Sequence, residues 1–389
     1  MRIAYVTETY PPELNGVALT VARTVRHLRE RGHVVDLIRP RQPGDDAPAD
    51  SSQWLTRGWP IPMYPDLRFG FAPAAALRRR YAQTGVDLVH LATPGPLAWT
   101  ALRAARALRL PTTSDFRTNF HKYSRYYRLG AFAPFVLGLL RRFHNRTGRT
   151  FVPTRAVERE LAAAGFHNLA VVGRGVDTER FSPARRSAEL RARWGARWGA
   201  LGGAPVLLYV GRVAAEKNVA LALHAFEALR RRQPDAQMVV VGDGPLRGAL
   251  EAGHPAARFV GVQRGDELAA CYASADLFLF PSLSDTFGNV TLEALASGLP
   301  VVAYDTAAAA EHVRHGESGL LVAPGDATGF ENSVSGLAMQ PQRLQEMRTH
   351  AFAAARRARW DEVLARFEIE LLDTIDAHQT PPAAAPVVA

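Results

Sequence analysis

The sequence predicts an α/β protein with two doubly wound domains, each a parallel sheet covered by helices on both faces. Short, continuous apolar stretches alternate with stretches of helical periodicity through most of the 389 residues. Strands of a parallel sheet are buried on both faces, so they read as continuous apolar runs. The alternation breaks once, at residues 173–186 (GRGVDTERFSPARR), and then starts again. The length is sufficient for two hydrophobic cores.

The first half contains a series of predicted strands and a clear first helix. The strands are expected at residues 3–7, 34–39, 86–91, 112–116, 150–153 and 169–172. A helix is expected over residues 17–31, and Gly32 ends it because glycine readily adopts the left-handed conformation of a helix C-terminus. Residues 41–65 are polar and rich in proline, which favours a surface loop region.

The second half repeats the pattern. Strands are expected at residues 206–211, 237–242, 258–262 and 277–280, with helices at 218–232, 246–252 and 266–273. An amphipathic helix is expected over residues 360–376, followed by a tail at 378–389 that is rich in Pro and Ala and is expected to be disordered. We therefore place the two domains at residues 1–180 and 181–359.

Charge is distributed unevenly along the chain. The formal net charge is +10 at pH 7, yet residues 1–180 hold 27 Lys and Arg against 14 Asp and Glu, whereas residues 181–389 hold 20 against 23. A basic first half suits an anionic membrane surface, an acidic substrate or nucleic acid. No nucleic-acid-binding signature accompanies it, so we expect no nucleic-acid partner. Because only two of the 47 basic residues are lysine, a coding bias toward arginine is an alternative explanation.

Cysteine usage and hydropathy constrain the compartment. Cys271 is the only cysteine in the sequence, so neither a disulfide nor a cysteine-based metal site is expected. The N-terminus enters a strand directly, and no run of about 18 apolar residues occurs. We therefore expect a cytoplasmic protein that is soluble or peripheral at the inner face of the cytoplasmic membrane.

The most informative segment is residues 281–303, PSLSDTFGNVTLEALASGLPVVA. It reads as a strand end, a turn, a short helix and a second strand, with Asp285 in the turn and Glu293 in the helix. A helix N-terminus attracts anions and a carboxylate accepts hydrogen bonds from hydroxyls, so the segment suits a ligand with both phosphate and sugar hydroxyls. The alternative is a buried βαβ unit in which Gly298 and Pro300 only end the helix.

Two other loops carry residues suited to a diphosphate. Arg212 and Lys217 follow the strand at 206–211, and two cations just before a helix can clamp a diphosphate; alternatively, both are solvated. Gly16 ends the loop ETYPPELNG at residues 8–16 and allows backbone to approach a phosphate; alternatively, the loop is an ordinary turn. No G-x-G-x-x-G is present there, which argues against a dinucleotide-dependent dehydrogenase.

A further loop, residues 114–127 (SDFRTNFHKYSRYY), mixes aromatic, amide and basic side chains after a strand. That mixture suits recognition of a sugar or a lipid headgroup, and the polar candidates are Arg117, Asn119 and His121. A lone histidine is more often a packed, hydrogen-bonded residue. The adjoining residues 129–146 join an apolar stretch to a basic end, which fits either a membrane interface or packing into the domain.

Taken in order, these segments resemble the GT-B glycosyltransferases of the family 4 type. The motifs that carry the resemblance are PPELNG, RGVDTERFSP, GRVAAEKN, VGDGP, the acidic segment at 281–303 and HGESGLLVAPGD, and they extend over nearly all of the chain. The resemblance implies two Rossmann-like domains facing across a cleft, with the helix at 360–376 returning to the first domain. It also implies retaining transfer of a sugar from a nucleoside diphosphate donor, without a metal ion.

The resemblance also implies a role for each motif residue. Arg212 and Lys217 would bind the diphosphate, Gly16 would approach it from the first domain, and Glu293 would hold the ribose hydroxyls. The residues expected to hold the donor sugar are Asp285, Phe287, Gly288 and Asn289. Arg212, Lys217 and Asp285 are the expected catalytic residues.

The sequence departs from the family pattern at two of these positions. The first acidic residue is usually Glu, whereas here it is Asp285, whose carboxylate reaches roughly 1.5 Å less far. Many relatives place His where this chain has Arg117. That difference leaves the contribution of the first domain open, with His121 as a substitute.

The sequence thus leads us to expect a hexosyltransferase, with mannose or glucose favoured, that acts on a lipid or glycan acceptor and needs no cofactor. Two alternatives stay open at this point: a nucleotide-sugar epimerase on the same fold, and a catalytically silent nucleotide-sugar binding module. The donor base, the acceptor and the oligomeric state are not specified by these residues.

Overall fold

The chain divides into two compact units in the computed structural model, which describes residues 1–13, 16–42, 45, 52–61, 64–117, 133–195, 204–283, 285 and 287–380. Unit 1 comprises Met1–Val172 together with the chain from Leu364 onward, and unit 2 comprises Gly173–Val363. The division falls where the regular alternation of the sequence breaks, eight residues before the predicted boundary at 180.

The C-terminal helix α15 (Trp360–Gln379) begins in unit 2 and continues in unit 1. It extends beyond residue 376, so the first two residues of the predicted tail are helical. Residues 381–389 of that tail lie outside the described residues.

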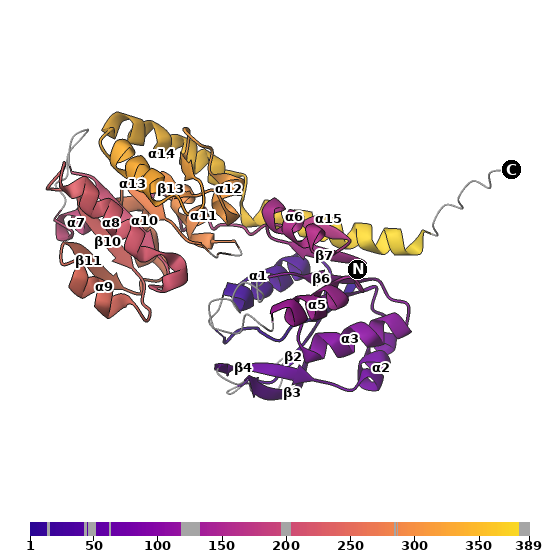
Figure 1. The fold of residues 1–389 in the computed structure, drawn as a ribbon. Helices are drawn as coiled ribbons and strands as arrows, with labels where there is room; N and C mark the ends of the chain where they lie inside the picture. The colour runs from indigo at the N-terminus through magenta and orange to yellow at the C-terminus, as the bar shows by residue number, and fades with distance from the viewer. Residues whose placement is uncertain are drawn as a thin grey trace. The chain divides into compact units, whose positions relative to one another are not determined.

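Unit 1 is built on a sheet in the order β4-β3-β2-β1-β5-β6-β7-β8 (Figure 1). Its strands are β1 (Arg2–Val6), β2 (Val34–Pro40), β3 (Gln53–Ile61), β4 (Tyr64–Phe71), β5 (Leu88–Leu91), β6 (Thr112–Asp115), β7 (Arg149–Val152) and β8 (Leu169–Val171). Its helices include α1 (Gly16–Glu30), α2 (Ala74–Thr84), α3 (Pro96–Ala107), α5 (Ala133–His144) and α6 (Arg155–Ala163). The described pairings are parallel except for the antiparallel pair β3–β4.

The first strand shows why its sequence is continuously apolar. Ile3 and Tyr5 belong to one buried cluster, with residues of α1 and α15, whereas Ala4 and Val6 belong to a second cluster, with residues of α2 and α3. Successive side chains of a strand point to opposite faces, and helices cover both faces here. Phe367 of α15 lies in the first cluster, so the C-terminal helix contributes to the core of unit 1.

The interval at 41–65 was predicted as a surface loop, and this prediction is wrong for residues 53–61 and 64–65. β3 and the start of β4 lie within it, and they extend the sheet beyond β2. Pro60 is tolerated in a strand because β3 pairs with β2 only as far as Thr56 and beyond that point pairs with β4 alone. Proline is compatible with such strand positions because its missing N–H removes no bond from a central ladder.

Unit 2 contains a fully parallel sheet in the order β11-β10-β9-β12-β13-β14. Its strands are β9 (Val206–Val210), β10 (Gln237–Val241), β11 (Ala257–Gly261), β12 (Leu277–Phe280), β13 (Val301–Tyr304) and β14 (Gly319–Val322). Its helices are α7 (Ala188–Arg193), α8 (Val219–Arg230), α9 (Arg247–Gly253), α10 (Gly265–Ser274), α11 (Asn289–Ala296), α12 (Ala307–His312), α13 (Ala327–Ala338) and α14 (Pro341–Arg356). The predicted class, two doubly wound α/β sheets, is confirmed.

Candidate functional site

The carboxyl ends of β9 and β12 carry the candidate site of unit 2. The two strands are neighbours in the sheet although β10 and β11 separate them along the chain. The order of the sheet reverses between them, and loops that leave such a pair diverge and open a crevice for ligands. A backbone hydrogen bond of 3.2 Å, from the Leu283 N–H to the Glu216 carbonyl, ties the two loops together.

Lys217 and Asp285 meet directly in this site. Lys217 Nζ lies 2.6 Å from Asp285 Oδ1, and the side chains are 14% and 17% exposed. Lys217 ends the 3-10 turn η3 (Ala215–Lys217), and Asn218 caps the N-terminus of α8 with a left-handed backbone conformation, φ 53°. The sequence predicts both charged residues at a ligand site, but it does not predict their ion pair.

The site retains unused hydrogen-bonding capacity. Asp285 Oδ2, Ser282 Oγ and Asn289 Oδ1 are buried and have no hydrogen-bond partner among the described residues. Buried polar atoms in folded proteins are nearly always hydrogen-bonded. Three such atoms in one short segment are therefore expected where a ligand or water binds.

Gly288 and Phe287 shape the turn that leads into α11. Gly288 has φ 86°, a left-handed conformation that strains residues with a side chain. Phe287 is buried, its ring lies 5.9 Å from the ring of His312, and its carbonyl accepts a hydrogen bond from the Ala308 N–H. The phenyl ring thus anchors the turn in the core, and the N-terminus of α11 follows directly.

Glu293 lies in the second turn of α11 and is half-buried. The hydroxyl of Tyr272, a buried residue of α10, donates to Glu293 Oε2 at 2.9 Å. Burial raises the pKa of Glu293 to about 7, and the hydrogen bond from Tyr272 acts in the opposite direction. Sequence reasoning missed Tyr272 because an aromatic residue in an apolar helix is typical of a packed core.

Arg212 lies at the edge of the site. Its Nη1 is 3.6 Å from Glu216 Oε1, and its side chain is 52% exposed. The Tyr209 hydroxyl donates to the Arg212 carbonyl at 3.0 Å, which fixes the backbone of this loop. Gly242 packs behind it, where a Cβ atom would lie 2.0 Å from the carbonyl oxygen of Gly211. This glycine serves the packing of two adjacent loops.

The residues predicted in the first half belong to unit 1. Gly16 is the first residue of α1, after the loop that follows β1. Arg117 is described and lies at the carboxyl end of β6. Asn119 and His121 lie outside the described residues.

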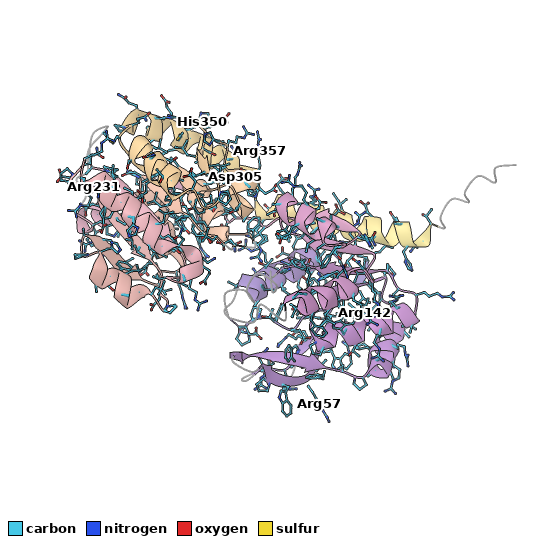
Figure 2. The ribbon with its side chains drawn as sticks, in the orientation of Figure 1. Arg57, Arg142, Arg231, Asp305, His350 and Arg357 are labelled. Atoms are coloured by element: carbon cyan, nitrogen blue, oxygen red, sulfur yellow. The ribbon has the colours of Figure 1, made fainter. Side chains whose placement is uncertain are left out.

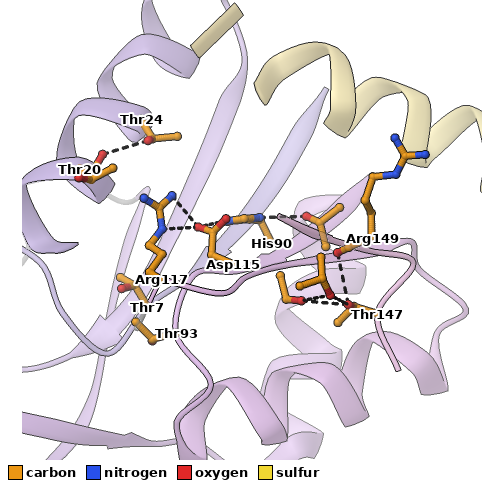
Figure 3. A network of polar contacts seen from close by, with 12 residues as sticks. Thr7, Thr20, Thr24, His90, Thr93, Asp115, Arg117, Thr147 and Arg149 are labelled. Atoms are coloured by element: carbon orange, nitrogen blue, oxygen red, sulfur yellow. Dashed lines mark hydrogen bonds and ion pairs between the residues drawn. The ribbon is translucent and has the colours of Figure 1, made fainter. Parts of the chain in front are cut away.

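Arg117 takes part in an internal ion pair (Figure 3). Its Nε and Nη2 both lie 2.6 Å from Asp115 Oδ2, and His90 Nε2 lies 3.1 Å from the same oxygen. Asp115 and His90 are buried, and the Arg117 side chain is 15% exposed. Burial raises the pKa of Asp115, but Arg117 and His90 outweigh this effect and hold the pKa below its ordinary value.

Glu8 was not predicted as an individual residue, although it lies in the predicted ligand loop at 8–16. Its carboxylate accepts hydrogen bonds from the backbone N–H groups of Gly70 in β4 and Leu97 in α3, the latter at 2.9 Å. Burial raises the pKa of Glu8 to about 7, and these hydrogen bonds lower it. Glu8 therefore connects β1, β4 and α3 within the unit.

The described residues contain neither a cluster of metal ligands nor a membrane-spanning helix. Among residues 1–380, apart from the gaps given above, no group of three or more His, Cys, Asp or Glu side chains is arranged to hold a metal ion. Within the same part of the chain, no helix has the length and apolar character needed to cross a membrane.

Comparisons with known proteins match nearly all of the chain. The sequence model for Glycosyltransferase Family 4 matches residues 14–180, and that for Glycosyl transferases group 1 matches residues 204–340. A GDP-mannose-dependent alpha-mannosyltransferase of Mycolicibacterium smegmatis is 35% identical over 386 residues, which cover 97% of this chain and 96% of that protein.

Two further similarities extend the comparison. An alpha-monoglucosyldiacylglycerol synthase of Streptococcus pneumoniae is 27% identical over 320 residues, covering 78% of this chain and 71% of that protein. The solved structure of sucrose-phosphate synthase from Thermosynechococcus elongatus matches with a TM-score of 0.73 at 19% identity, covering 97% of this chain and 99% of that one. Fold, motifs and relatives agree: the chain belongs to glycosyltransferase family 4 and is a glycosyltransferase of the GT-B fold.

Proposed function

We propose that this chain transfers a hexose, mannose or glucose, from a nucleoside diphosphate sugar to a lipid or glycan acceptor, with retention of configuration and without a metal ion. The observation that carries the proposal is the ion pair of Lys217 with Asp285, in the turn before α11, at the reversal point of the unit 2 sheet. The names of two relatives, a GDP-mannose-dependent mannosyltransferase and a monoglucosyldiacylglycerol synthase, support the donor and acceptor classes.

Each donor group has a suitable partner in unit 2. We assign the diphosphate to Lys217 and to the guanidinium of Arg212, which reaches solvent beside it. The ribose hydroxyls are assigned to Glu293, whose carboxylate accepts one hydrogen bond from Tyr272 among the described residues. The donor sugar is assigned to Asp285 and to the turn at 287–289, where Asp285 Oδ2 and Asn289 Oδ1 are without partners among the described residues.

The proposed reaction depends on stabilising the charges that develop in the transition state. Sugar transfer passes through an oxocarbenium-like state while negative charge grows on the departing diphosphate. Fixed cations at that position stabilise the transition state, and removing one such group typically costs about 10²- to 10³-fold in rate. We assign no separate general base, because the departing phosphate takes the acceptor proton on the same face of the sugar, which gives retention.

Unit 1 is assigned the acceptor side. Gly16 opens α1, where backbone approaches the donor diphosphate in this proposal. Arg117 donates to Asp115 from Nε and Nη2, so a contact with a sugar has to come from its other N–H groups. Asn119 and His121 stay predictions for the same side.

An anionic membrane surface is proposed as a partner of α5. One face of this helix packs into unit 1 through Leu140 and Phe143, whereas Phe135 and Leu139, on the other face, are 73% and 45% exposed. Arg142 follows on the exposed face (Figure 2). Exposed apolar side chains beside cations are typical of helices that lie at a membrane interface.

The membrane proposal is tested with F135S/L139S and vesicles of neutral or anionic phospholipid. Wild-type sedimentation should rise with anionic lipid, fall with salt and be lost in the variant. The matched control is I369S/L372S, which removes an exposed apolar pair from α15 (56% and 39% exposed). Equal loss in both variants, or indifference to lipid charge, would overturn the assignment to α5.

The activity is tested with GDP-mannose, UDP-glucose and related donors in the presence of diacylglycerol or glycan acceptors. We expect nucleotide release that requires an acceptor, persists in EDTA and gives an α-linked product by NMR. Strict metal dependence or an inverted product would contradict the proposed chemistry. Donor conversion without acceptor would indicate an epimerase, and tight nucleotide binding without turnover would indicate a silent module.

A further inference from the structure

The two cations of the candidate site each have an acidic partner. Lys217 contacts Asp285 at 2.6 Å, and Arg212 lies 3.6 Å from Glu216. The pairs differ in their exposure to water. Both side chains of the first pair are largely buried, whereas the arginine of the second is 52% exposed. The Coulomb interaction is therefore stronger and less screened in the Lys217–Asp285 pair.

A carboxylate beside Lys217 weakens the binding of a diphosphate. A phosphate oxygen that binds Lys217 has to share the ammonium with Asp285 Oδ1, at close range and away from bulk water. The ammonium has three N–H donors and can serve both groups, but the two anions repel each other. The repulsion grows with ligand charge, and a free nucleoside diphosphate carries more negative charge than its sugar ester.

A bound sugar adds a favourable contact at Asp285. Oδ2 has no hydrogen-bond partner among the described residues, so it can accept from a hydroxyl while Oδ1 stays on Lys217. A charged acceptor forms stronger hydrogen bonds than a neutral one. The nucleotide sugar can therefore form a hydrogen bond to Asp285 that offsets the repulsion, whereas the nucleoside diphosphate cannot.

We propose that Asp285 is a selectivity residue, which disfavours the nucleoside diphosphate through its ion pair with Lys217 and favours the intact nucleotide sugar through its second oxygen. This inference rests on the proposed function. It gives the residue a role in product release as well as in sugar binding, since the product is the ligand that it disfavours.

Calorimetric titration of D285N with GDP, UDP and the matching nucleotide sugars tests the proposal. We expect the affinity for the nucleoside diphosphate to rise about tenfold, while the affinity for the nucleotide sugar stays the same or falls. The matched control is D305N, which removes the same charge from an exposed residue that follows β13 of the same sheet (Figure 2). Its effect on either ligand should stay within about twofold.

A second variant separates the ion pair from a general charge effect. In the K217M background, D285N should raise the affinity for the nucleoside diphosphate by less than it does in the wild-type background, because only the direct repulsion is relieved and no ammonium is freed. Circular dichroism and thermal unfolding of each variant show whether it is folded.

Three outcomes overturn the inference while leaving the proposed function in place. An unchanged affinity for the nucleoside diphosphate in D285N would limit Asp285 to sugar contact. Weaker binding of both ligands by a folded D285N would make it a structural residue, and an equal gain in D305N would make the effect one of net charge. If the wild-type protein binds none of the nucleotides, the proposed function itself fails.

Discussion

Glu8 in unit 1 and Glu293 in unit 2 are glutamates in similar electrostatic surroundings. Burial raises the pKa of each to about 7. Their hydrogen bonds differ: both oxygens of Glu8 accept backbone N–H groups, from Gly70 and Leu97, whereas one oxygen of Glu293 accepts from Tyr272 among the described residues. A raised pKa alone does not separate scaffold from binding site. What separates the two is the number of hydrogen bonds that each carboxylate can still accept.

The ion pairs of the two units repeat this contrast. Asp115 Oδ2 in unit 1 is shared by Arg117 and His90, so its bonds are made within the fold. Asp285 in unit 2 holds Lys217 with one oxygen and has no partner for the other among the described residues. We infer that unit 1 uses its described buried charges for stability and that unit 2 keeps part of this capacity for a ligand.

The largest effect, a loss of unfolding free energy, is expected from D115N. The substitution leaves Arg117 largely buried without its counter-ion, and breaking a buried pair in this way costs about 3–5 kcal/mol of unfolding free energy. Hydrogen exchange of β5 and β6 reports this loss in unit 1 by itself. K217M, which breaks the ion pair of unit 2, should leave exchange in these strands unchanged. A loss below about 1 kcal/mol in D115N would remove the contrast between the two pairs.

K217M is expected to show the next largest effect. It should lower kcat/KM about 10²- to 10³-fold, since a fixed cation is lost where charge develops. R231M is the matched control, because Arg231 is exposed at the C-terminus of α8, beyond the other end of that helix. A comparable loss in both variants would mean that Lys217 has no special place in the reaction.

Glu8 should make the stability of unit 1 depend on pH. Its folded-state pKa is raised from 4.5 to about 7, so the protonated form favours folding. Protonated Glu8 contributes up to about 3 kcal/mol to the free energy of unfolding. This contribution is fully present below about pH 4.5 and is lost as the pH rises to 7. E8Q removes this titration, so the difference between the two pH profiles isolates it. Parallel profiles from pH 5 to 7 would show that Glu8 does not titrate in this range.

Glu293 should make donor binding, rather than stability alone, depend on pH. Ribose hydroxyls need the ionised carboxylate as acceptor, and its pKa is about 7. The Kd for a nucleotide sugar should therefore rise about tenfold per pH unit below 7, and E293Q should bind weakly without this slope. A nucleotide sugar is used because its diphosphate does not ionise near neutral pH. The same slope in E293Q would assign the titration to another group.

Much of this contrast could be predicted from the sequence, because continuous apolar runs identify buried parallel strands such as β9 and β12. β3 and β4 were missed because proline signals a loop unless the strand pairing is known. The Lys217–Asp285 contact depends on β9 and β12 being neighbours, which only the sheet order specifies. The Asp115–Arg117 pair had a signal, since residues two apart at a strand end point to the same side.

A crystal structure with a bound nucleotide sugar would show which unit holds the donor and through which residues. We expect the diphosphate within hydrogen-bonding distance of Lys217 Nζ, the ribose on Glu293 and a sugar hydroxyl on Asp285 Oδ2. This expectation would be contradicted by a donor bound at the carboxyl edge of the unit 1 sheet, on Arg117, or by a unit 2 site in which Ser282, Asp285 and Asn289 gain no hydrogen bond.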